Sequence, residues 1–102
     1  TDSTLRLRLL QARALIALHQ PREAQPIVEE MASIIEGRYP ADPTWRRDVL
    51  DLKAELVQAQ GKNRDAREFA RQAAEVAQQA WGRDAPATQR ALATLRAVSG
   101  PD

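Results

Sequence analysis

The sequence predicts an all-α protein, built as a right-handed stack of five antiparallel helices. Two observations lead to this prediction: apolar residues recur at helical spacing, and the whole pattern repeats after 42 residues. In the stretch 64–80 the apolar residues return every three or four positions, which is the stripe of an amphipathic helix. Most of them are alanines, so a neighbouring helix can approach closely. Gly61 separates this stretch from the helix before it, and the two together predict a tight helical hairpin.

The same design stands 42 residues earlier in the chain. The apolar set in 24–35 matches the set in 66–77 position by position. Further pairs at this offset are Leu10 with Leu52, Ala12 with Ala54, Ala17 with Ala59, Arg22 with Arg64, Tyr39 with Trp81 and Asp42 with Asp84. A fixed period built from paired helices is typical of helical repeat proteins, in which each hairpin is stabilised by stacking on the next.

Each helix is expected from its own pattern and end signals. In the first helix, leucine and isoleucine residues spread around much of the circumference, so neighbours should cover it on two sides. Pro26 falls near the start of the second helix, where its missing amide costs little, and Gly37 is expected to end that helix. Gly61 ends the third, and Asn63 is expected to cap the fourth. The fifth follows Pro86 and lacks a partner helix, as a terminal capping helix does. The expected ranges are 4–18, 22–36, 44–60, 63–80 and 87–98.

Residues 59–66, Ala-Gln-Gly-Lys-Asn-Arg-Asp-Ala, resemble the helix–turn–helix core of a tetratricopeptide repeat. The longer period is similar to the roughly 42-residue variety found in kinesin light chains and bacterial signalling proteins. In that variety an aromatic residue or Gly, an acidic residue and Pro follow each hairpin, as in 39–43 and 81–86 here. The chain departs from the pattern at His19, where Gly is usual, and at Pro21 and Asn63, where an aromatic residue is usual. The resemblance implies two repeats plus one extra helix over nearly the whole chain.

Composition excludes several classes of protein. The net charge is only +1, and aromatic residues are few, so no nucleic-acid partner is expected. Cysteine is absent, which excludes disulfide and thiol chemistry. The longest apolar run, 14–18, is far shorter than the roughly 20 residues of a membrane span, so no membrane partner is expected. We expect a cytoplasmic protein, and abundant Ala and Arg fit a high-GC bacterial genome. The chain opens at Thr1 rather than Met, so 1–102 is expected to be one domain of a longer protein.

The residues that carry enzyme chemistry are sparse and scattered. His19 is the only histidine, and its place at a helix C-terminus explains it better than a role as base or metal ligand. No serine lies in a nucleophile turn, and no Gly-rich phosphate loop is present. The carboxylates of 29–30 and 48–55 fit helical surface charge better than acid–base pairs. The sequence therefore predicts no enzyme activity, no cofactor and no metal site.

The candidate binding residues follow from the resemblance. In tetratricopeptide arrays the first helix of each hairpin lines a concave groove that takes an extended peptide or a partner's helix. The residues expected there are Arg6, Arg13, Arg47, Asp51, Glu55 and Arg90. Arginine suits carboxylate recognition because its planar fork bonds both oxygens, although these arginines could equally solvate helix faces. The carboxylate clamp of chaperone-binding members is not predicted, because its helix Asn residues are missing. Trp45 either fills a junction between hairpins or, if exposed, anchors a partner.

The function predicted from these observations is a non-catalytic protein–protein interaction module. The partner is a protein or peptide bound in the concave groove. A first alternative is a homodimerisation or structural domain of a bacterial regulator or kinase, because a short array leaves apolar end faces that self-association or a neighbouring domain would cover. A second alternative is a small-molecule sensing domain of a transcription regulator, which would need an enclosed apolar pocket between the first helices of the hairpins.

Overall fold

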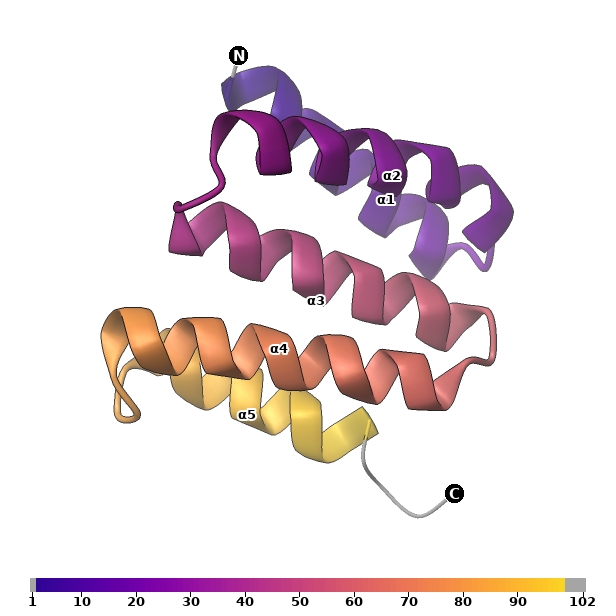
Figure 1. The fold of residues 1–102 in the computed structure, drawn as a ribbon. Helices are drawn as coiled ribbons and strands as arrows, with labels where there is room; N and C mark the ends of the chain where they lie inside the picture. Colours follow the sequence, from indigo (N-terminus) through magenta and orange to yellow (C-terminus); the bar gives the residue numbers. More distant parts are fainter. Residues whose placement is uncertain (1, 99–102) are drawn as a thin grey trace.

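Five helices, joined by short turns, make up the part of the chain that the computed structural model describes, residues 2–98 (Figure 1). They are α1 (Asp2–Ala17), α2 (Pro21–Arg38), α3 (Pro43–Ala59), α4 (Asn63–Trp81) and α5 (Pro86–Val98). No strand occurs within these residues. The predicted all-α stack of five helices is confirmed, with helix ends within about three residues of those expected.

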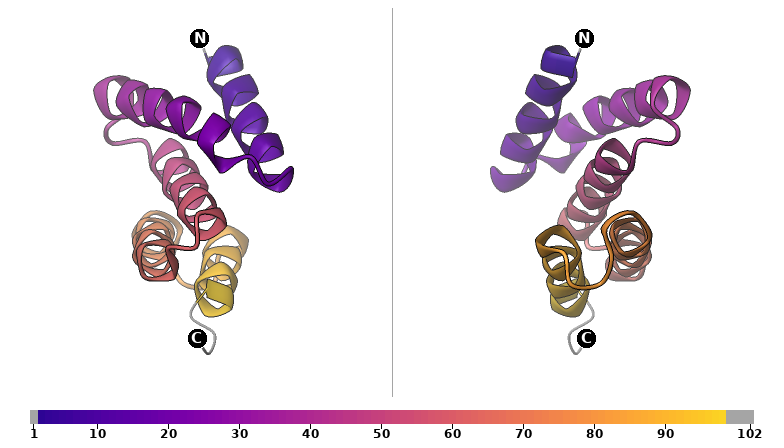
Figure 2. Two further views of the ribbon diagram at one scale, coloured as in Figure 1. Left: turned by 90° about the vertical axis from the view of Figure 1, so that its right-hand side faces the viewer. Right: turned by 90° about the vertical axis from the view of Figure 1, so that its left-hand side faces the viewer.

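The helices pack in a zigzag, in which α3 lies between the α1–α2 pair and the α4–α5 pair (Figure 2). Every helix packs on the next one along the chain, and α1 also packs directly on α3. Seen end on, α1 and α5 lie on one side of the molecule and α2 and α4 on the other. The helices that open each unit of the repeat therefore share one face.

The core is large at the N-terminal end and small at the C-terminal end. Leucine, isoleucine, valine and methionine side chains from α1, α2 and α3 fill the first part, around the fully buried Met31, Val28 and Leu52. Between α4 and α5 the buried set is only Ala74, Ala77 and Ala91, with two half-buried leucines against it. Burial of apolar area scales with side-chain size, so most of the hydrophobic stabilisation lies in the first three helices.

The turns between paired helices use the same backbone conformation in both repeats. Gly61 has φ +80°, and His19, which stands 42 residues before it, has φ 60°. A residue with a Cβ is strained in this left-handed region, whereas Gly is not. His19 therefore takes the conformation of the glycine it replaces.

Two expected helix ends are wrong. α2 continues through Gly37 to Arg38, and the amide of Tyr39 closes its last turn on the carbonyl of Ile35 at 2.8 Å. Asn63 is the first residue of α4 rather than its cap, and no side chain caps that helix. A cap that was not singled out is Asp42, whose Oδ1 accepts from the amides of Thr44 and Trp45 at 2.9 and 3.2 Å.

The outer face of α1 bears exposed leucines, as expected for the end of an array. Leu7 and Leu10 are 67% and 54% exposed. The residues 42 positions later, Val49 and Leu52, are buried in the core that α3 forms with α1 and α2. The exposed stripe of α1 thus occupies repeat positions that are covered in α3.

None of the helices in the described range is long and apolar enough to cross a lipid bilayer.

Candidate partner-binding groove

A groove of about 270 Å³ runs between α1, α3 and α5. Five of the seven predicted binding residues line it: Arg13, Arg47, Asp51, Glu55 and Arg90. The others on its walls are Asp48 of α3 and the small residues Ala87, Ala91 and Thr94 of α5. The structure therefore brings together predicted residues that are far apart in the sequence, since Arg13 and Arg90 are separated by 77 positions.

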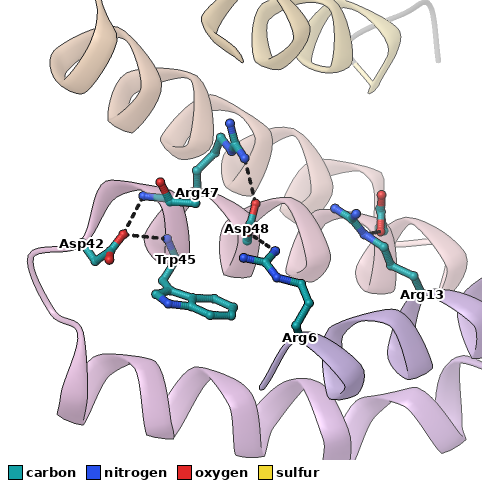
Figure 3. A network of polar contacts seen from close by, with 8 residues as sticks. Arg6, Arg13, Asp42, Trp45, Arg47 and Asp48 are labelled. Atoms are coloured by element: carbon teal, nitrogen blue, oxygen red, sulfur yellow. Dashed lines mark hydrogen bonds and ion pairs between the residues drawn. The ribbon is translucent and has the colours of Figure 1, made fainter. Parts of the chain in front are cut away.

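Asp48 is the centre of a three-residue ion network at one end of the groove (Figure 3). Its Oδ2 accepts from Arg6 Nη1 at 3.1 Å and its Oδ1 from Arg47 Nη2 at 3.0 Å. Asp48 is only 6% exposed, so both carboxylate oxygens need these partners. The predicted residue Arg6 thus holds Asp48 at the edge of the groove and is not among its lining residues.

Trp45 is buried, as expected for a residue that fills a junction between hairpins, and it is not exposed as an anchor for a partner. The indole is 5% exposed and packs in the core of α1, α2 and α3. Tyr39 stacks on it at 6.1 Å, and the Arg6 guanidinium lies 4.5 Å from its centroid. Trp45 therefore fills the junction between the first hairpin and α3, and its ring face supports the arginine above it.

A second ion pair joins α1 to α3 further along the groove. Arg13 Nε lies 3.5 Å from Glu55 Oε2, and both side chains are partly exposed. Arg13 and Glu55 are 42 residues apart, as are Arg6 and Asp48. Equivalent positions of the repeat therefore face one another on neighbouring helices, with arginine on α1 and a carboxylate on α3 in both cases.

The groove exists because the junction between α3 and α5 lacks the large side chains that fill the junction between α1 and α3. The buried residues Leu5, Leu9, Trp45 and Leu52 close the first junction. Their equivalents in the second junction are Arg47, Asp51, Ala87 and Thr94. Two leucines are thus replaced by charged residues, and two large side chains by small ones. The space is left open and polar.

Burial inside the groove changes the acidity of its carboxylates. Desolvation raises the pKa of Asp51 from 3.8 to about 6, although Arg47 and Arg13 lower it and Asp48 and Glu55 add to the rise. Desolvation likewise raises the pKa of Glu55, against the opposing effect of Arg13. Perturbed acids in a hollow are typical of functional sites.

Two groove residues have no ion partner within residues 2–98. Asp51 accepts no hydrogen bond and forms no ion pair there, although it is half-buried, and the exposed Arg90 likewise has no carboxylate partner. By contrast, Arg47 bonds Asp48 and lies 5.3 Å from the centroid of Trp81. The groove thus offers one unpaired cation on α5 and one unpaired anion on α3.

No cluster of three His, Asp or Glu residues in the described range is arranged to hold a metal ion. His19 is exposed in the turn after α1 and does not line the groove. Comparisons with protein families, curated proteins and solved structures found no match to the chain.

Proposed function

We propose that this domain is a non-catalytic interaction module, similar to a tetratricopeptide array, which binds a peptide segment or helix of another protein in the groove between α1, α3 and α5. The observation that supports this most directly is the pair of unpaired opposite charges, Asp51 and Arg90, in a groove of about 270 Å³. An open groove lined by charged residues suits a peptide, whereas a small-molecule sensor would need an enclosed apolar pocket.

The Arg47 side chain is fixed at the wall of the groove before a partner arrives. The Nε of Arg47 is buried and donates to no acceptor in the described structure. The rest of the Arg47 side chain is held by Asp48 and Trp81, so the donor is already oriented before a partner arrives.

Selection of peptides from a displayed random library against the isolated domain tests the proposal. Selected peptides should perturb backbone amide signals of α1, α3 and α5 in NMR spectra. Arg90→Gln should lower the affinity for these peptides about tenfold or more, as loss of a charge-assisted contact does. Arg64→Gln is the matched control, because Arg64 carries the same charge on α4, outside the groove. Peptides that bind equally well to Arg90→Gln, or that perturb only α2 and α4, would refute groove binding.

Homodimerisation is a second candidate, favoured by the exposed leucines of α1. Leu7 and Leu10 form an apolar stripe, and apolar patches of this kind mark association surfaces. Light scattering over a wide dilution range measures the solution mass. A dimer that dissociates in Leu7→Glu would make self-assembly the function, and a monomer at every concentration would exclude it.

A further inference from the structure

The residues that line the groove show what kind of partner Asp51 lacks. Asp51 stands at the repeat position of Leu9, which is buried in the junction between α1 and α3. A carboxylate at a core-equivalent position loses part of its hydration, and for Asp51 the charges of Arg47 and Arg13 offset only part of that cost. Local departures of this kind, where a residue contradicts the packing rule of its position, are expected where a protein binds something.

The first junction shows what meets a carboxylate of α3. There, α1 supplies an arginine on each occasion: Arg6 bonds Asp48 and Arg13 pairs with Glu55. In the second junction α5 supplies no arginine opposite Asp51 or Glu55. The positions on α5 equivalent to Asp51 and Glu55 are Ala93 and Ala97. No basic residue of α5 therefore stands at the position equivalent to Asp51 or Glu55.

The cations already near Asp51 are engaged elsewhere. Arg47, on α3, donates to Asp48 at 3.0 Å, and Arg13, on α1, pairs with Glu55 at 3.5 Å. Arg90, from α5, lines the same groove but forms no ion pair with Asp51. The small residues of α5 leave the space beside Asp51 open. A long, flexible or planar cationic side chain fits an opening of this size and charge.

We infer that the bound partner inserts a lysine or arginine side chain between α3 and α5, where its charged head pairs with Asp51 beside Glu55. This inference rests on the proposed function, since it names the chemistry of the segment that the groove takes. The rise in the pKa of Asp51 caused by desolvation supports it, because an inserted cation offsets that cost.

The test is a double-mutant cycle on peptides selected by the domain. Each Lys or Arg of a selected peptide is replaced by a neutral isostere, with citrulline in place of arginine, and binding is measured by calorimetry to wild type and to Asp51→Asn. The critical replacement should weaken binding to wild type about tenfold and binding to Asp51→Asn much less, so that the two changes are not additive. Asp65→Asn, which removes an exposed carboxylate of α4, should behave as wild type.

Acidity gives an independent readout. Affinity of wild type should fall as the pH is lowered through about 6, where Asp51 takes up a proton, and the fall should be smaller in Asp51→Asn. The charged groups around Asp51 are Arg13, Arg47, Asp48 and Glu55, together with Arg90 of α5 in the same groove. Of these, Glu55 also has a raised pKa and leaves a residual slope.

The failure of this inference is distinguishable from failure of the proposed function. Two results would overturn the inference and leave groove binding intact. One is a peptide that binds the groove without a basic residue, and the other is a citrulline replacement that changes the affinity for wild type and for Asp51→Asn equally. A domain that selects no groove-binding peptide would overturn both. Asp51→Leu, which restores the residue type of the equivalent Leu9, should fold, lose the peptide and so separate binding from folding.

Discussion

Replacing Asp51 by asparagine should make the free domain more stable at neutral pH. The pKa of this carboxyl is about 6 in the folded chain against an ordinary 3.8, because burial disfavours its charged form. Between about pH 4 and pH 6 the folded chain therefore keeps a proton that the unfolded chain has released. Stability falls as the pH rises through this window, and the full penalty is present above it. Asparagine carries no charge and escapes the penalty.

The size of the effect follows from the shift. A difference of about two pKa units corresponds to roughly 3 kcal/mol. The carboxylate is half-buried, and solvent screening reduces the figure, so we expect Asp51→Asn to gain about 1–2 kcal/mol above pH 7 and almost nothing near pH 4. The favourable field of Arg47 and Arg13 is already contained in the net shift, because both residues lower the pKa against the larger effect of burial.

Urea unfolding of wild type and variant, followed by far-ultraviolet circular dichroism at several pH values, measures this difference. Carboxylates that do not interact with Asp51 titrate alike in both proteins and cancel in the comparison, whereas Asp48 and Glu55 are coupled to it. Asp65→Asn is the control, and it should lose up to about 1 kcal/mol, because Asp65 lies in the first turn of α4 and favours the helix dipole. A variant less stable than wild type above pH 7, or a gain of equal size near pH 4, would show that Asp51 is not a desolvated carboxylate in the folded chain.

Three further substitutions test the fold. His19→Gly should raise the unfolding free energy by about 1 kcal/mol in a denaturant titration, because His19 has the left-handed conformation that Gly61 adopts without strain; no gain would contradict the backbone angle. Asp42→Ala should lower it by about 1 kcal/mol through loss of the α3 cap, and an unchanged midpoint would contradict the capping bonds. Leu52→Ala should lower it by about 2–5 kcal/mol and Leu10→Ala, at the equivalent but exposed position, by far less; equal losses would mean that α1 is covered in solution.

The repeat explains why the fold was predictable from the sequence. Apolar positions at helical spacing define each helix, and the offset of 42 residues states which helix is equivalent to which. The resemblance to tetratricopeptide arrays implies that Arg13, Asp51 and Arg90 share one surface, because the first helices of the hairpins line one groove in those arrays. The helix ends were less predictable. Gly37 lies inside α2, because a glycine ends a helix only where it leaves the helical conformation. The sequence alone does not show whether packing against other helices keeps it helical.

Burial was the part of the site that sequence reasoning did not resolve. Asp48 was noticed only as one of several helical carboxylates, and the signal that could have identified it is its offset of 42 residues from Arg6. Opposite charges at equivalent positions of a repeat are candidates for an ion pair between neighbouring helices. The sequence favours Trp45 as a residue that fills a junction, but an aromatic residue at a helix start can also lie on the surface. Only the packing of α1 on α3 decides between them.

The departures from the repeat are more informative about binding than the repeat itself. Where both junctions carry equivalent apolar residues, the positions serve packing and would be filled the same way in any array of this kind. Asp51 and Ala87 stand where the first junction places Leu9 and Trp45, and both changes sacrifice buried apolar contact. A junction built only for stability would keep the leucine and the indole. The second junction instead holds an open space, a desolvated carboxylate and an unpaired arginine, and a partner that supplies an apolar stem with a cationic head would recover what these changes give up.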